Sequence, residues 1–221
     1  MSLLVKICGV NSQPAAEAVL NAGADFAGLV FYARSPRNLS LTDAAPLAGL
    51  MRGRLRLVAL MVDPDDAAID AVLAAIHPDY LQLHGQESAG RIGDIRARFG
   101  VHIIKAVTVA EAADLDDAAA LMQAADMLLF DARPPRGAAR TGGNGVAFDW
   151  NILSGRSFPR PWLLAGGLTP ANVTAAAYAA GAGMVDVSSG VESAPGVKDP
   201  DKIAAFVAAA HNFTPSHNLK L

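Results

Sequence analysis

Short apolar runs recur along the chain, separated by stretches in which apolar residues follow helical spacing. The runs are continuous rather than alternating, which is typical of parallel strands covered on both faces. Eight such runs predict eight strands: Leu4–Cys8, Phe26–Phe31, Leu57–Val62, Tyr80–Leu83, His102–Val107, Met127–Asp131, Trp162–Ala165 and Met184–Ser188.

The stretches between these runs indicate amphipathic helices. Apolar side chains share one face in Pro14–Ala22 and again in Asp66–Ile76. Helix starts are predicted at Ser12, two residues before a proline, and at Asp63, directly before one. Helix ends are expected at three glycines: Gly23, Gly100 and Gly181.

Strand and helix patterns that alternate eight times predict a closed (β/α)₈ barrel. We expect one domain over residues 1–210, followed by a frayed tail at 211–221. A doubly wound open sheet is the rival fold, but it usually carries a G-x-G-x-x-G turn after its first strand, and the residues after Ile7 do not match that turn. The longest irregular stretch, Ala132–Ala147, follows the sixth predicted strand and is either a mobile cover or disordered.

Composition narrows the class of protein. The chain has 221 residues, of which 52% are hydrophobic and 18% charged, so it can fold around a sizeable core. The net charge of −3 favours neither nucleic acid nor an anionic membrane surface as a partner. A single cysteine excludes an intrachain disulfide and suits a reducing compartment. Without a signal-peptide pattern or a long apolar run, we expect a cytoplasmic protein. The five histidines lack zinc-ligand spacing, so no metal is expected.

Two turns of small residues follow the last two predicted strands. The first contains Gly166 and Gly167, and Thr169 and Pro170 after them predict a helix start with Thr169 as its N-cap. The second contains Ser188, Ser189 and Gly190. Backbone N–H groups in such turns can bind an anion, and in a (β/α)₈ barrel these two loops frequently form a phosphate site. Read singly, each turn is explained by turn chemistry alone.

The carboxyl ends of the predicted strands carry a thiol, carboxylates and cations, which suit proton transfer on a phosphorylated substrate. Lys6 precedes Cys8 by two residues, so its side chain is expected on the same side but one layer deeper. The residues at the carboxyl ends of these strands are Lys6, Cys8, Asp63, His84, Lys105, Asp131 and Asp186.

Ordered motifs from Lys6 to about Lys198 resemble the phosphoribosylanthranilate isomerase family. They are Lys6-Ile7-Cys8-Gly9, Phe31 to Ser35-Pro36-Arg37, Gln82-Leu83-His84-Gly85, Leu129-Phe130-Asp131, Gly142-Gly143-Asn144-Gly145 and the two turns. The resemblance implies the same barrel and an isomerase that needs no cofactor. Its reaction is an Amadori rearrangement, from N-(5-phosphoribosyl)anthranilate to 1-(2-carboxyphenylamino)-1-deoxyribulose 5-phosphate, in tryptophan biosynthesis. One departure is Asn144, where the family commonly has threonine.

The resemblance also implies roles for individual residues. Asp131 would be the general acid that opens the sugar ring, kept protonated by burial, and Cys8 the base, with its pKa lowered by nearby positive charge. Arg37 would bind the anthranilate carboxylate. His84 and Asp186 would either contact the substrate or only form hydrogen bonds at the barrel mouth. Phosphate would be bound by Gly166, Gly167, Ser188, Ser189 and Gly190.

Two other functions remain open from the sequence. Another phosphosugar enzyme could use this barrel, but histidine-pathway isomerases use two aspartates, whereas the first strand here ends in Cys8. An inactive barrel that binds a phosphorylated metabolite and acts as a regulator is the second. For the isomerase we expect a small phosphorylated substrate as the partner, and a monomer or homodimer.

Overall fold

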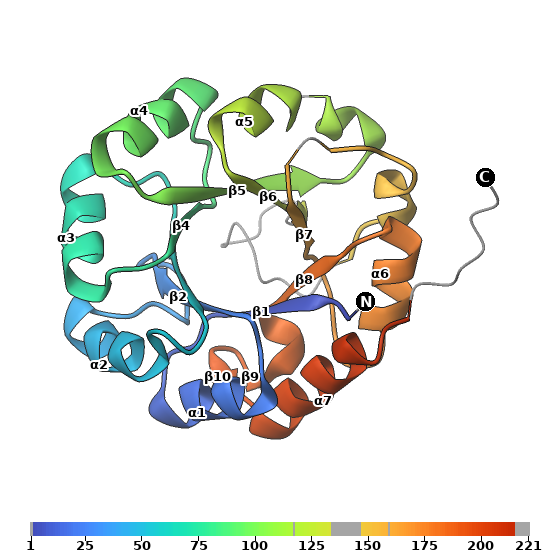
Figure 1. Cartoon of the computed structure of the whole chain (residues 1–221), viewed down its shortest axis with the longest axis horizontal. Coiled ribbons are helices and arrows are strands. Elements are labelled where there is room, and N and C mark those ends of the chain that lie inside the picture. The colour runs from blue at the N-terminus through green and yellow to red at the C-terminus, as the bar shows by residue number, and fades with distance from the viewer. Residues whose placement is uncertain (1, 117, 134–146, 159, 215–221) are drawn as a thin grey trace.

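The computed structural model describes residues 2–116, 118–133, 147–158 and 160–214. Eight parallel strands form a closed barrel in sequence order, and β8 pairs with β1 to complete the ring (Figure 1). This confirms the predicted (β/α)₈ barrel and excludes the open sheet. The strands are β1 Leu4–Cys8, β2 Phe26–Phe31, β3 Arg56–Met61, β4 Tyr80–Leu83, β5 His102–Val109, β6 Met127–Ala132, β7 Trp162–Leu164 and β8 Met184–Val187.

Helices cover the outside of the ring. They are α1 Gln13–Ala22, α2 Leu41–Met51, α3 Asp66–Ile76, α4 Ala89–Phe99, α5 Ala118–Ala124, α6 Val173–Ala180 and α7 Pro200–His211. Shorter elements join them: the 3₁₀ turns η1 Ala112–Leu115, η2 Trp150–Leu153 and η3 Ser189–Val191, and a hairpin of β9 Glu192–Ala194 and β10 Val197–Lys198. Among the described helices, none has the length and apolar character that a membrane crossing requires.

Several predicted helix boundaries are confirmed. Ser12 caps α1 through a hydrogen bond from the Ala15 N–H. The three predicted terminal glycines all adopt left-handed backbone after a helix, with φ of 78° at Gly23, 64° at Gly100 and 71° at Gly181. Glycine suits these positions because it has no Cβ to clash there.

Two predicted helix starts are wrong. Asp63 has a φ of 45°, and its carboxylate accepts from the Gln86 N–H, so it serves a loop; Asp65 caps α3 instead. Thr169 does not cap α6, which begins at Val173. The side chain of Asn172 accepts from the Thr169 N–H and donates to the Gly167 carbonyl, and these bonds hold residues 167–172 as a turn before the helix.

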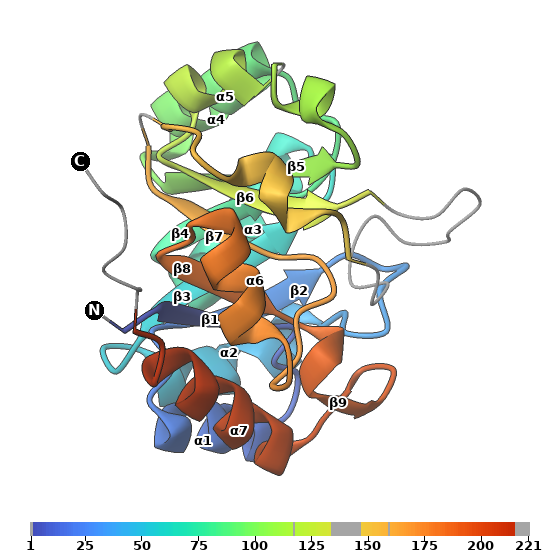
Figure 2. The same ribbon diagram turned by 90° about the vertical axis from the view of Figure 1, so that its right-hand side faces the viewer.

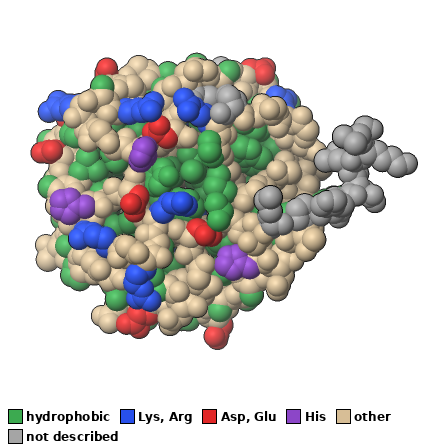
Figure 3. Space-filling model, in the orientation of Figure 1, with side chains coloured by type: hydrophobic (Ala, Val, Ile, Leu, Met, Phe, Trp, Pro, Cys, Tyr) green, Lys and Arg blue, Asp and Glu red, His purple; other side chains and the backbone are tan. Residues whose placement is uncertain are grey.

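The core lies on both sides of the barrel wall because side chains alternate between the two faces of each strand. Outward-facing residues pack against the helices in the larger cluster. Inside the barrel lies a smaller apolar cluster of Phe26, Val58, Ile104, Ala106, Met127, Leu129, Leu163 and Ala165. Hydrophobic side chains also gather over the centre of the face where the strands begin, with charges of both signs around them (Figure 3). The barrel is therefore a filled core.

The β9–β10 hairpin lies at the end of the barrel toward which the strands run (Figure 2). Most of the predicted loop Ala132–Ala147 and most of the predicted tail at 211–221 lie outside the described residues. Helix α7 continues one residue past the expected boundary, to His211, and Phe213 packs on the core.

Candidate active site

Lys6 and Asp186 form a buried ion pair below Cys8. The Lys6 Nζ donates to Asp186 Oδ1 at 2.7 Å, and the Lys6 side chain is fully buried. A methyl group on Gly28, in the neighbouring strand β2, would lie 3.1 Å from Cys8 Sγ and 3.4 Å from Lys6 Nζ. Glycine at position 28 thus leaves room for both groups, and Lys6 lies on the same side as Cys8, as strand alternation predicts.

The environment of the Cys8 thiol differs from the prediction. Burial raises the pKa of Cys8, and the nearby cations Lys6, Lys198 and Arg37 offset this only in part. The cations are present as expected, but desolvation of the thiolate raises the pKa by more than the cations lower it. The pKa of Lys6 is raised: burial opposes its charge, yet Asp186 and Cys8 together more than compensate.

Asp131 ends on the inner face of β6, opposite a histidine from the loop after β4. Its Oδ2 lies 3.4 Å from the His84 Nε2, and its Oδ1 accepts from the Ala132 N–H. The other ring nitrogen, Nδ1, lies 3.0 Å from the Gln82 side-chain amide. Both Asp131 and His84 are nearly buried. Gln82, which the sequence argument did not single out, therefore fixes the ring that faces Asp131.

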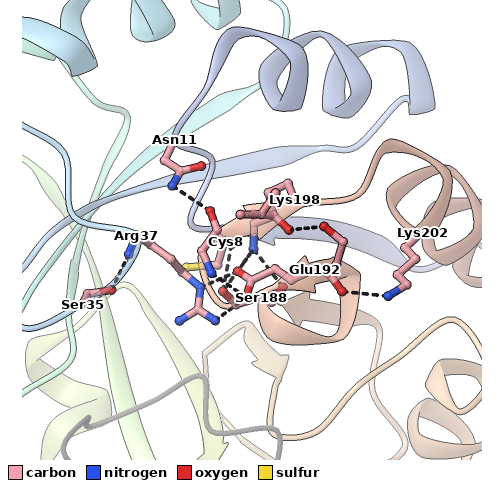
Figure 4. Close-up of polar contacts among 11 residues, drawn as sticks. Cys8, Asn11, Ser35, Arg37, Ser188, Glu192, Lys198 and Lys202 are labelled. Carbon is pink, nitrogen blue, oxygen red and sulfur yellow. Dashed lines mark hydrogen bonds and ion pairs between the residues drawn. The ribbon is translucent and has the colours of Figure 1, made fainter.

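Arg37 is buried in the loop between β2 and α2. Its Nε donates to Glu192 Oε1 at 2.6 Å and its Nη2 to Oε2 at 2.8 Å, so the pair is bidentate. Glu192 also accepts from the Lys198 Nζ at 2.9 Å. Figure 4 shows Arg37 and Lys198 converging on Glu192 beside Cys8.

The two predicted phosphate turns lie side by side. A methyl group on Gly190 would lie 1.8 Å from the Leu168 carbonyl oxygen, so the turns are in backbone contact. Gly166 and Gly167 have φ of 84° and 68°, and neither N–H donates a hydrogen bond to a described residue. The hydroxyl of Ser188 is already engaged, since it donates to the Cys8 carbonyl at 3.0 Å.

Lys105 and Asp63 belong to a separate polar network. Lys105 points away from the barrel interior, because its neighbours Ile104 and Ala106 face inward. Its Nζ donates to Glu87 Oε2 at 2.7 Å and to the Gly85 carbonyl at 2.7 Å. These bonds hold the loop that carries His84, so Lys105 supports the mouth from outside.

Sequence reasoning missed three residues of this mouth: Gln82, Glu192 and Lys198. Gln82 precedes His84 by two residues, and strand alternation alone would place it on the inner face. Glu192 and Lys198 gave no such signal, since they lie on a hairpin whose strands have only three and two residues, too few for periodicity to detect. Within the described residues, no three His, Cys, Asp or Glu side chains gather in a way that would hold a metal ion.

The mouth of this closed barrel carries an acid, a thiol and cationic groups, and the paired glycine turns lie at the same mouth. This combination defines an enzyme of the (β/α)₈ class that acts on a phosphorylated small molecule. Residues 5–209 match the family described as N-(5'-phosphoribosyl)anthranilate (PRA) isomerase. The chain belongs to this family, as the sequence resemblance implied.

Individual relatives agree with this assignment. The chain is 52% identical to the N-(5'-phosphoribosyl)anthranilate isomerase of Paramagnetospirillum magneticum, across 97% of this chain and 100% of the relative. The solved phosphoribosylanthranilate isomerase of Thermotoga maritima superposes with a TM-score of 0.84 at 34% identity, covering 94% of this chain and 98% of the other. A phosphoribosylanthranilate isomerase in complex with reduced 1-(o-carboxyphenylamino)-1-deoxyribulose 5-phosphate gives a TM-score of 0.80 at 31% identity, with the same coverage.

Proposed function

We propose that this chain converts N-(5-phosphoribosyl)anthranilate into 1-(2-carboxyphenylamino)-1-deoxyribulose 5-phosphate, with Asp131 as the general acid and Cys8 as the base. One observation carries the assignment of roles. The only thiol of the chain and a nearly buried carboxyl end on the inner face of the same barrel mouth, next to two turns with open backbone N–H groups. An aldose-to-ketose rearrangement needs one proton donor and one proton acceptor.

The steps balance with these two groups. Asp131 gives a proton to the ring oxygen as the C1–O bond breaks, and the anilinic nitrogen supplies electrons to form a protonated imine at C1. The Cys8 thiolate then removes the C2 proton, and that electron pair forms the C1–C2 double bond while nitrogen regains its lone pair. The enolamine then gives its C2 hydroxyl proton to the Asp131 carboxylate and receives a proton at C1 from the Cys8 thiol, which yields the ketone and restores both groups.

The same proposal assigns the binding groups. Arg37 binds the anthranilate carboxylate, and the N–H groups around Gly166, Gly167, Ser189 and Gly190 bind the phosphate. Ser188 contributes its backbone only, because its hydroxyl is committed to the Cys8 carbonyl. His84 lies beside the acid Asp131, and Asp186 pairs with Lys6 below the base Cys8.

The deciding experiment follows the fluorescence of phosphoribosylanthranilate with purified protein. We expect the signal to disappear with the wild type and to persist with Cys8→Ala, whose rate should fall at least ~10²-fold because the base is gone. An unchanged far-ultraviolet circular dichroism spectrum controls for folding. A wild type without activity would instead support an inactive phosphosugar-binding barrel, and near-normal turnover by Cys8→Ala would remove Cys8 from the mechanism.

We place this activity in the cytoplasm, which suits a reduced catalytic thiol. The partner is the small phosphorylated substrate, and the protein acts as a monomer or homodimer; sedimentation at assay concentration distinguishes these two states.

A further inference from the structure

We propose that Glu192 is the positioning residue of the aryl-carboxylate site: it turns the Arg37 guanidinium so that the edge formed by Nη1 and the second N–H of Nη2 faces the substrate. The inference rests on the proposed function, in which Arg37 binds that carboxylate. Glu192 itself does not touch substrate in this proposal and acts through Arg37.

The contacts of Glu192 are those of a fixed anchor. Both carboxylate oxygens accept from Arg37, and Oε1 also accepts from Lys198 and Oε2 from the Gly196 N–H at 3.1 Å. The side chain is 4% exposed. Although burial opposes ionisation, the hydrogen bonds from Arg37 and Lys198 keep the pKa of Glu192 below its ordinary value. The carboxylate is therefore charged and rigid at neutral pH.

The backbone around the pair leaves Arg37 little freedom. A methyl group on Gly9, whose φ is 80°, would lie 2.3 Å from Arg37 Cδ. A methyl group on Gly196 would lie 2.6 Å from the Pro36 carbonyl oxygen, so the hairpin that carries Glu192 packs directly on the loop that carries Arg37. Asn11 fastens the same hairpin, because its Nδ2 donates to the Gly196 carbonyl at 2.9 Å. Two close glycine contacts and the Asn11 amide thus hold the hairpin and the Arg37 loop against each other. Figure 4 shows Asn11, Arg37 and Glu192 around this place.

The remaining donors of Arg37 point to an oxyanion. Glu192 takes the Nε N–H and one N–H of Nη2, and neither Nη1 nor the second N–H of Nη2 donates to a residue in the described part of the chain. Among the contacting side chains, Arg37 and Lys198 carry two positive charges against the single negative charge of Glu192. One positive charge is left unbalanced in a nearly buried place, which favours an anionic ligand group there.

Lys198 is turned away from this position. Its Nζ donates to the Ser188 carbonyl at 2.8 Å as well as to Glu192, so it connects the anchor to the second glycine turn. Burial lowers the pKa of Lys198 even though Glu192 favours its charged form. The bond from Lys198 to the Ser188 carbonyl does not involve Glu192, so the second glycine turn keeps this support when only Glu192 is changed.

The substitution Glu192→Gln separates positioning from simple charge. Removing a negative charge beside a cation tightens the binding of any anion if charge alone matters. If Glu192 positions Arg37, binding weakens instead, because the new amide group opposes an arginine N–H with another donor and the guanidinium turns away. The two explanations therefore predict opposite signs for the same variant.

The experiment measures the affinity of reduced 1-(o-carboxyphenylamino)-1-deoxyribulose 5-phosphate and of inorganic phosphate by titration calorimetry. We expect Glu192→Gln to lower the affinity for the reduced compound by roughly 10- to 100-fold, as for loss of one charge-assisted bidentate pair. Inorganic phosphate should bind no more weakly than before. In turnover, KM should rise by a similar factor while kcat changes less than about threefold. Asp201→Asn, an exposed carboxylate of α7, is the matched control and should change neither affinity.

Arg37→Met provides the second arm. If Glu192 acts through Arg37, the double variant Arg37→Met/Glu192→Gln should bind the reduced compound no more weakly than Arg37→Met alone. Additive losses, or tighter binding by Glu192→Gln, would overturn the inference. Should Glu192→Gln not fold, Glu192→Asp keeps the charge but withdraws it by about 1.5 Å; unchanged binding then overturns the inference as well. If the wild type fails to bind the reduced compound, it is the proposed function that fails.

Discussion

At the scale of single residues, the mouth shows burial and charge acting against each other on one thiol. Cys8 lies beside Lys6, yet the net effect raises the pKa of the thiol because desolvation of the thiolate dominates. Lys6 keeps its own charge through Asp186. Lys6 is therefore a partial offset to burial, while Asp186 raises the pKa of the Cys8 thiol; without Lys6 the thiol would ionise still less readily.

Alkylation of Cys8 tests this balance directly, since the chain has only one cysteine. Because the folded pKa of Cys8 is raised, the rate with iodoacetamide should stay low at neutral pH and reach its midpoint above the pKa of a free thiol. Lys6→Met should move that midpoint further upward, as it removes the nearest positive charge. Arg54→Met, an exposed cation, should leave the midpoint unchanged. A downward shift in Lys6→Met would contradict the offset.

Asp131→Asn tests the general acid. The amide keeps the shape and can still accept from the Ala132 N–H, but it cannot deliver a proton. We expect kcat to fall at least ~10²-fold with KM nearly unchanged, as for an interaction made in the transition state. Steady-state kinetics decide the point: weakened binding with an intact kcat would make Asp131 a positioning residue and Asp186 the next candidate for the acid.

At the scale of elements, the strands were predictable from sequence and two of the helix starts were not. Apolar runs gave every barrel strand to within two residues, because strands covered on both faces must be apolar throughout. Asp63 and Thr169 were misread because Asp-Pro and Thr-Pro also occur in turns that precede a helix. Asp63 is held in its loop by a hydrogen bond with Gln86, and Thr169 is held in its turn by one with Asn172. The local spacing of residues does not predict these contacts.

The candidate site divides in the same way. Strand ends led to Cys8, His84, Asp131 and Asp186, since in this fold catalytic groups lie at the carboxyl ends of strands. Glu192 was not predicted because its partner Arg37 is 155 positions away in the chain, and no local sequence pattern encodes a contact of that range.

Gly190→Ala tests the contact between the two glycine turns. The added methyl group would meet the Leu168 carbonyl oxygen at 1.8 Å, so the turns must separate. We expect a stability loss of about 1–3 kcal/mol, as for overpacking, and a loss of inorganic phosphate binding in calorimetry. Gly183→Ala, whose methyl group would meet no atom within 4 Å, is the matched control. Unaltered phosphate affinity in Gly190→Ala would place the phosphate elsewhere.

At the scale of the whole molecule, closure of the ring is made by its first and last units. β1 pairs with β8, and the Leu3 N–H donates to the Ala210 carbonyl at the end of α7. Phe206 of α7 is fully buried in the outer core. Helix α7 therefore packs over the junction of β1 and β8, which is the seam of the barrel, and contacts α1.

Phe206→Ala should weaken this seam. Loss of a fully buried aromatic side chain costs about 3–5 kcal/mol, to be measured as the change in the free energy of unfolding in urea. Tyr178→Ala removes an aromatic side chain that is 62% exposed and should change stability by no more than about 0.5 kcal/mol. Equal losses in the two variants would show that the seam is not packed as described.

The Arg37–Glu192 pair has a consequence for how the protein is made. On the ribosome, Arg37 emerges long before Glu192, which lies 155 positions further along the chain. Until then Arg37 lacks this partner, so under the proposed role of Arg37 a nascent chain cannot yet bind the aryl end of the ligand. Closing so long a loop is also a slow event in folding. Under this proposal, binding of the reduced compound requires the complete fold. The time at which this binding appears during refolding would report when Arg37 and Glu192 come together.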